Sequence, residues 1–170
     1  MDLSLTKKGD YVVCAALYLA RKWDEVQKHR ESGSEKVMRE YATLDEISLE
    51  MDLPRSYTPQ IMGLIVRARL AEAKAGRDGG YKLVRKPSEI TLLEVVEAGE
   101  GQLRTKGCTL RGGPCRWEDV CALHEAWSAA TRAVRGSLQG ITLEEVALVD
   151  EAIEEGAYSV PSDHHRNIHS

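Results

Sequence analysis

Three cysteines and a histidine lie close together in the second half of the sequence. Cys108, Cys115 and Cys121 fall within fourteen residues, and His124 follows three residues later. Glycines and a proline lie between the first two cysteines, so this segment is expected to form a loop that can wrap around an ion or a cluster. The sequence after Cys121 is typical of a helix, and residues three apart lie on one side of a helix. Thiolate and imidazole donors together predict a soft metal site.

The number of cysteines favours metal binding over disulfides. Four cysteines in 170 residues are too few for a disulfide-based scaffold, and Cys14 lies in an apolar run where a small buried side chain is expected. No secretory signal is present, and no apolar run approaches the ~20 residues that span a bilayer. We therefore expect a soluble, cytoplasmic protein with reduced thiols. A zinc site, whose ligands usually lie in pairs about two to four residues apart, and a metal-free thiol switch remain alternatives.

The charges are unevenly distributed along the chain. The whole sequence has a net charge of −4, but residues 54–86 contain eight basic and two acidic residues, a net charge of +6. From residue 87 onward there are seven basic and fourteen acidic residues. A basic segment in an acidic protein predicts a local surface for nucleic acid.

Two short helices and a hairpin account for this basic segment. Thr43 and Glu46 form the pattern of a capping box at the start of a first helix, and residues 52–54 end it. A second helix is predicted over residues 56–68, with its proline in the first turn, where proline is tolerated. Residues 70–85 then read as strand, glycine-rich turn and strand. The order predicts a mainly α winged helix-turn-helix with a small β-hairpin wing.

In such a fold the second helix enters the major groove of DNA, and the wing approaches the minor groove or the phosphates. The side chains expected to face the groove are Arg55, Ser56, Tyr57, Thr58 and Gln60. Arg67 is a candidate phosphate contact, and Arg77 is the best cation at the wing tip. The apolar residues Ile61, Leu64 and Ile65 are expected to face the core.

Taken together, these segments resemble the Rrf2 family of bacterial winged-helix regulators. Residues 3–20 resemble the first helix of the family, residues 77–98 its wing and the following helix, and residues 141–146 its last helix. The likeness extends to about Val149, and the cysteine loop falls where family members bind an iron–sulfur cluster. The resemblance implies a [2Fe–2S] cluster, with [4Fe–4S] as the alternative, held by the thiolates of Cys108, Cys115 and Cys121.

The fourth ligand has two candidates by this resemblance. His124 matches the histidine of a branch in which three cysteines and one histidine hold a [2Fe–2S] cluster. Asp10 matches the aspartate that another branch contributes from the partner subunit to a [4Fe–4S] cluster. We expect His124 to be the ligand and Asp10 to be an acidic residue at a helix N-terminus. The first gap in the loop has six residues where the family usually has five.

The remaining segments predict a dimer and no enzyme. A helix from Cys121 carries an apolar stripe at a spacing of three to four residues: Leu123, Ala126, Trp127, Ala130, Val134 and Leu138. The family packs this helix against its symmetry mate and binds palindromic double-stranded DNA. No catalytic motif is present, and neither a membrane nor a small-molecule substrate is expected as a partner. A thiol-based redox protein and a zinc-stabilised interaction module are the alternatives.

The predicted organisation has three parts. Residues 1–86 form the DNA-binding domain, with a charged insertion at about residues 24–42 to which we assign no chemistry. Residues 87–155 contain the cluster loop and the dimerisation helix. Residues 156–170 are polar and form a tail that is expected to be disordered.

Overall fold

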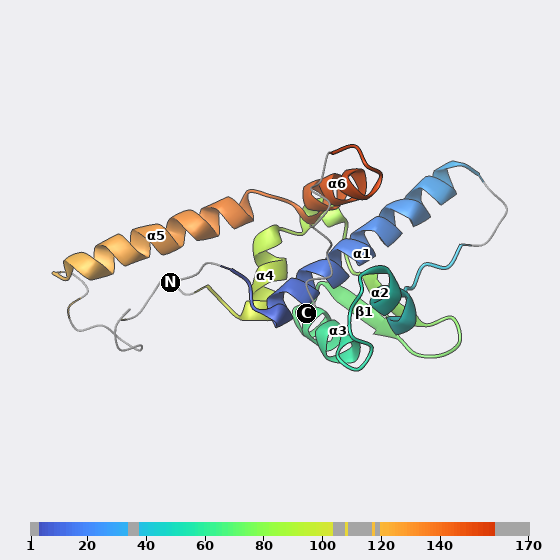
Figure 1. The fold of residues 1–170 in the computed structure, drawn as a ribbon, viewed down its shortest axis with the longest axis horizontal. Helices are drawn as coiled ribbons and strands as arrows, with labels where there is room; N and C mark the ends of the chain where they lie inside the picture. Colours follow the sequence, from blue (N-terminus) through green and yellow to red (C-terminus); the bar gives the residue numbers. More distant parts are fainter. Residues whose placement is uncertain (1–3, 34–37, 104–107, 109–116, 118–119, 159–170) are drawn as a thin grey trace.

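A long central helix organises the computed structural model, which describes residues 4–33, 38–103, 108, 117 and 120–158. This helix, α1 (Lys7–Glu31), begins where the Thr6 hydroxyl accepts a hydrogen bond from the Gly9 amide. Its last residues belong to the charged insertion, which extends α1. The other described elements gather around α1, apart from one projecting helix (Figure 1). No helix within the described part is long and apolar enough to cross a membrane.

The helix-turn-helix forms from α2 (Leu44–Glu50) and α3 (Thr58–Arg67). The predicted capping box is present at the start of α2, where Thr43 and Glu46 exchange hydrogen bonds. In the turn that follows, the buried Ser48 hydroxyl donates to the carbonyl of Leu53 over 2.6 Å and so holds the chain in position for α3. The position of this motif in the sequence is therefore confirmed.

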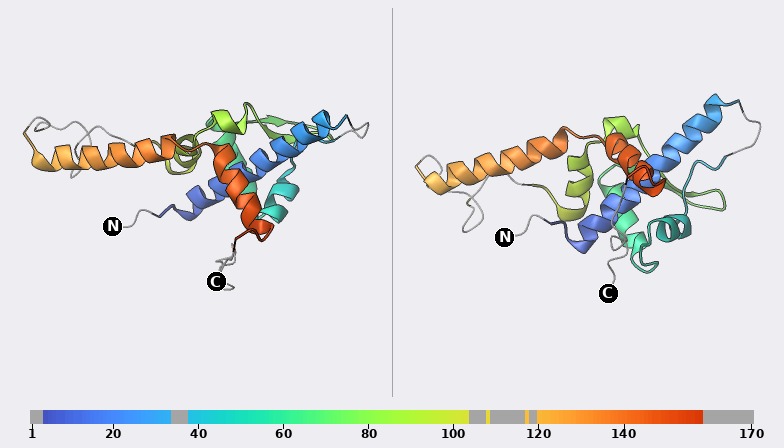
Figure 2. Two further views of the ribbon diagram at one scale, coloured as in Figure 1. Left: turned by 90° about the horizontal axis from the view of Figure 1, so that it is seen from above. Right: turned by 45° about the horizontal axis from the view of Figure 1, so that its top comes forward.

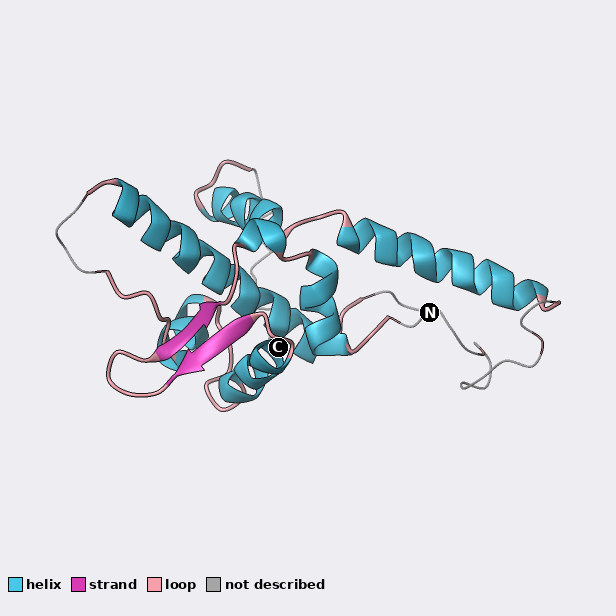
Figure 3. Ribbon diagram, turned by 180° about the vertical axis from the view of Figure 1, so that it is seen from behind, coloured by secondary structure: helices cyan, strands magenta, loops and turns pink. Residues whose placement is uncertain are grey.

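The wing is an antiparallel hairpin of β1 (Ala71–Lys74) and β2 (Gly80–Leu83). Figure 3 shows its two strands beside the helical body, at the end opposite to the projecting helix. Gly80 has a φ of +141°, and a Cβ atom there would lie 2.3 Å from the carbonyl oxygen of Ala42. Glycine at this position therefore lets a third chain segment approach the wing closely.

The C-terminal half contributes a short 3-10 helix, η1 (Pro87–Glu89), and three α-helices: α4 (Leu92–Glu100), α5 (Ala122–Gln139) and α6 (Leu143–Glu154). The caps of α4 and α6 pair with each other, because the Leu92 amide donates to Ile141 and the Leu143 amide donates to Ile90, each over 2.8 Å. This pairing fixes the C-terminal end of α5 to the body. The rest of α5 extends outward in both views of Figure 2.

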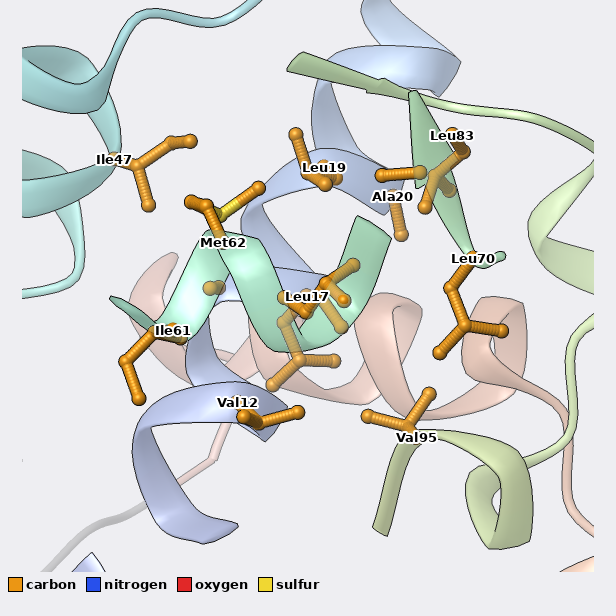
Figure 4. Packing of buried hydrophobic residues seen from close by; sticks show 14 of the residues in the cluster. Val12, Leu17, Leu19, Ala20, Ile47, Ile61, Met62, Leu70, Leu83 and Val95 are labelled. Atoms are coloured by element: carbon orange, nitrogen blue, oxygen red, sulfur yellow. The ribbon is translucent and has the colours of Figure 1, made fainter. Parts of the chain in front are cut away.

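One hydrophobic core runs through the body. Figure 4 shows Val12 and Leu17 of α1 among residues of α3, the wing and α4. Ile90, Val95, Leu143 and Ala147 belong to the same buried cluster, although all four lie beyond the predicted domain boundary at residues 86 and 87. The buried core therefore continues beyond residue 86, because α4 and α6 both pack on α1.

Two capping carboxylates predict how the fold responds to acid. Burial opposes ionisation of Glu46 and Glu94, but hydrogen bonds from Thr43, and from Thr91 and Arg85, hold both pKa values below their usual 4.5. A lowered pKa in the folded state adds stability that is complete above the unfolded pKa and is lost as the pH falls through the folded pKa.

Urea unfolding at about pH 7 and about pH 3 tests this contribution. In Glu46→Gln and Glu94→Gln, the free energies of unfolding at the two pH values are expected to differ less than in the wild type. Glu31→Gln, which removes an exposed carboxylate outside any capping box, is the matched control. The expectation would be contradicted if the free energy of unfolding changed between the two pH values as much in the two capping variants as in the wild type.

Candidate nucleic-acid interface and metal centre

The turn before α3 presents polar side chains to solvent. Arg55 and Ser56 before α3 and Gln60 in its first turn are exposed, so all three side chains are accessible to a ligand. Arg55 lies 3.7 Å from Asp45 of α2, and both side chains are about three-quarters exposed. An exposed ion pair of this kind is weak, so Arg55 can exchange it for a phosphate or a base at little cost.

Of the predicted groove-facing residues, Thr58 is buried and Tyr57 packs against the core. Thr58 is only 1% exposed, and its hydroxyl donates to the Pro54 carbonyl over 3.1 Å. Tyr57 is half-buried and packs edge-on against the ring of Tyr11. The spacing of three and seven residues from Thr58 to the buried Ile61 and Ile65 places Thr58 on the inward face of α3. That spacing is the sequence signal that identifies Thr58 as a core residue.

A cationic hollow of about 560 Å³ separates the wing from the start of α2. Three arginines line it: Arg39, Arg55 and the wing-tip residue Arg77. Arg77 is exposed, and Arg67 at the end of α3 is also exposed. Sequence reasoning missed Arg39, since it belongs to the charged insertion and only the tertiary fold brings it to the wing.

Within the cysteine loop the structure describes Cys108, Trp117, Val120 and Cys121. Cys108 and Cys121 are half-buried, whereas Cys115 lies outside the described residues. Cys121 is the N-cap residue of α5, its carbonyl accepts a hydrogen bond from the His124 amide over 3.0 Å, and its thiol takes no part in capping. The Nε2 atom of His124 lies 3.4 Å from the hydroxyl of Ser128.

The donors fit an iron–sulfur or zinc site by their chemistry, since thiolate and imidazole are the ligands that both prefer. In the part of the chain that the structure describes, no group of three or more His, Cys, Asp or Glu side chains could hold a metal ion.

The N-terminus of α1 carries the other candidate ligand, Asp10. It is an exposed acid in the first turn of α1, as predicted, and its carboxylate lies 3.9 Å from the half-buried thiol of Cys14. Glu100, at the end of α4, accepts hydrogen bonds from the amide and the hydroxyl of Thr6. The N-terminus of α1 is therefore held next to the point where the chain enters the cysteine loop.

The same entrance is tied to α5. The Glu97 carboxylate accepts hydrogen bonds from the Leu103 amide over 3.1 Å and from Arg135 of α5 over 2.5 Å. Arg135 also donates to the carbonyl of Leu103 over 3.3 Å. This network links α4, the residues that lead into the cysteine loop and the helix that follows the loop, so a change in the loop can alter the orientation of α5.

The N-terminal part of the apolar stripe of α5 has little covering within one chain, whereas Val134 and Leu138 are half-buried. Leu123 and Trp127 are 42% and 40% exposed, whereas Ser128, on the same helix, is buried. A helix of 18 residues with this stripe exposed presents a surface suited to a second helix.

Comparison with known proteins identifies the fold and the family. The computed structure matches that of the global cysteine regulator CymR of B. subtilis with a TM-score of 0.62 and 24% identity, covering 87% of this chain and 98% of the other. It matches T. potens IscR with a TM-score of 0.63 and 23% identity, covering 95% and 96%. Both similarities confirm the winged-helix fold.

The sequence comparisons carry the functional assignment. The HTH-type transcriptional regulator IscR of Photorhabdus laumondii is 29% identical over 152 residues, which cover 89% of this chain and 84% of the relative. These relatives are transcription regulators, in agreement with the prediction that the chain is not an enzyme. The family profile described as Rrf2, iron-dependent transcriptional regulator, matches residues 5–148. The chain therefore belongs to the Rrf2 family of transcription regulators.

Proposed function

We propose that this protein is a homodimeric, DNA-binding regulator that senses iron, nitric oxide or redox status through an iron–sulfur cluster. Cys108, Cys115 and Cys121 supply three ligands, and His124 supplies the fourth, with Asp10 of the partner subunit as the alternative. The preferred cluster is [2Fe–2S], and [4Fe–4S] is the alternative. Such clusters gain and lose electrons or are themselves lost, and this chemistry provides the signal.

The observation that carries the proposal is the position of Cys121. It is the last residue before α5, and α5 both exposes an apolar stripe and contacts the loop entrance through Arg135. A bound cluster that fixes the loop therefore acts at the root of the helix proposed to form the dimer. The orientation of α5 sets the distance between the two copies of α3.

The energies required for this coupling are small. A difference of ~1–3 kcal/mol between two dimer arrangements changes DNA affinity about 5- to 150-fold. The hydrogen bonds among Glu97, Leu103 and Arg135 involve charged groups, and such bonds contribute about 1.5–3 kcal/mol each. Their energy is therefore large enough to supply this coupling.

Selection from a library of random duplex DNA tests the proposal. The protein is expected to enrich sequences that contain two inverted half-sites with centres about one helical turn apart, as two copies of α3 require. Enrichment of a single half-site would contradict the dimer. Failure to enrich any sequence, by protein reconstituted with iron and sulfide as well as by protein without them, would contradict sequence-specific DNA binding.

Arg77→Ala is expected to weaken binding to the selected duplex and to reduce the slope of log affinity against log salt by about 1, because one phosphate contact is lost. Fluorescence anisotropy titrations over a range of salt concentrations measure both quantities. Arg132→Ala removes the same charge from an exposed site on α5 and is the matched control. Equal affinities for Arg77→Ala and Arg132→Ala would exclude the wing tip as a DNA contact.

A further inference from the structure

Four consecutive residues, Arg39 to Ala42, all contact the wing. We call this segment the wing brace. It is the end of the charged insertion and runs alongside β2 before α2 begins. The amides of Ala42 and Tyr81 each donate to the carbonyl of the other residue, over 2.9 and 2.8 Å, so the wing brace extends the hairpin by one backbone bridge.

The side chains of the wing brace hold the strands. Tyr41 donates from its hydroxyl to Glu72 of β1 over 2.8 Å, and the ammonium groups of Lys74 and Lys82 lie over its ring. Glu40 pairs with Lys82 of β2 and with Arg30 of α1. The wing brace thus joins the end of α1 to both strands of the wing.

Arg39 holds the wing loop itself. Its Nη2 atom donates to the Gly79 carbonyl over 2.7 Å and to the Arg77 carbonyl over 3.3 Å. The loop contains Gly76, with a φ of +103°, and the buried Gly79, so few side chains of its own restrain it. Because one guanidinium binds two loop carbonyls, it restricts the backbone on either side of Asp78. This backbone carries Arg77, the residue that we propose contacts DNA.

We propose that Arg39 is a positioning residue for DNA binding: it fixes the wing loop so that Arg77 faces DNA, and the charged insertion thereby takes part in operator recognition. This inference rests on the proposed DNA-binding function. The Nη2 atom of Arg39 donates to two loop carbonyls, so the proposal assigns its contribution to affinity to the position of the wing and not to a phosphate contact of its own.

Amide hydrogen exchange of the full-length protein without DNA tests the first step. Arg39→Ala is expected to accelerate exchange at residues 76–80, and Arg39→Lys is expected to behave in the same way, because an ammonium lacks the planar donor geometry of guanidinium. Arg132→Ala is the control and is expected to leave these residues unchanged. Unchanged exchange in both Arg39 variants would overturn the positioning role whether or not the protein binds DNA.

A double-mutant cycle on the selected duplex tests the second step. Arg39→Ala is expected to reduce affinity about as much as Arg77→Ala, and the double variant is expected to bind no more weakly than Arg77→Ala alone, since both act through one contact. Additive losses, together with a further fall of about 1 in the salt slope, would assign Arg39 a phosphate of its own and overturn the proposal. Full affinity in Arg39→Ala would also overturn it.

Discussion

Cys115→Ala is expected to abolish cluster binding while the protein remains folded. The proposed cluster uses all three thiolates of the loop, those of Cys108, Cys115 and Cys121. Without one of them the loop has too few ligands to hold the cluster. Protein reconstituted anaerobically with iron and sulfide is expected to be coloured in the wild type and colourless in the variant. Iron and acid-labile sulfide, assayed per chain, are expected to fall with the colour.

Cys14→Ala is the matched control for this experiment. The Cys14 thiol lies on α1 beside Asp10, outside the loop, so its removal makes the same chemical change without removing a proposed ligand. The control is expected to retain the wild-type spectrum. Far-ultraviolet circular dichroism is expected to show the same helical signal in both variants.

Variants of the fourth ligand refine the result. His124→Ala is expected to change the visible spectrum if the imidazole binds the cluster, whereas Asp10→Ala is expected to change it if the partner subunit contributes a carboxylate. A wild-type protein that stays colourless after reconstitution would refute the cluster. Bound zinc in that case would support a zinc-stabilised module, and the absence of metal would support a thiol-based switch.

The parts of the fold that the sequence predicts well are those determined by neighbouring residues. The capping box of Thr43 and Glu46, the proline in the first turn of α3 and the apolar stripe of α5 are all local patterns. Each acts within one or two helical turns, so it can be recognised without knowledge of the tertiary fold. The charge segregation likewise locates the basic surface at α3 and the wing.

The errors and omissions involve contacts between distant segments. The position of Thr58 at the start of α3 predicts that it faces the DNA groove. Its side chain is instead buried, because it lies on the apolar face of α3. Arg39 lies 38 residues before Arg77, and no local pattern relates the two. The core likewise joins distant segments, because residues of α4 and α6 complete a buried cluster that begins in α1.

Gly99→Ala is expected to cause a large loss of stability. The α1 and α4 backbones approach each other so closely here that a Cβ atom on Gly99 would lie 2.8 Å from the Cα atom of Gly9 and 3.3 Å from the Cβ atom of Val12. Backbone atoms cannot rotate away as the end of a side chain can, so the two helices must separate. A cost of about 2–3 kcal/mol in the free energy of unfolding is expected. The melting temperature then falls by roughly 5–10 °C.

Gly136→Ala makes the same change where nothing opposes it. A Cβ atom added to Gly136 of α5 would meet no heavy atom within 4 Å among the described residues. Gly136 also follows Trp127 by nine residues, about two and a half turns, which places it opposite the apolar stripe. Gly136→Ala is expected to leave the free energy of unfolding unchanged or to raise it by up to about 1 kcal/mol, since alanine has a higher helix propensity than glycine.

Differential scanning calorimetry at one protein concentration compares both glycine variants with the wild type. A lower melting temperature in Gly99→Ala alone is the expected result, because only there does the added methyl group meet the backbone of a second helix. Equal melting temperatures for Gly99→Ala and Gly136→Ala would show that α4 can move away from α1 without cost. The conclusion that Glu100 and Thr6 hold the N-terminus of α1 next to the loop entrance would then be wrong.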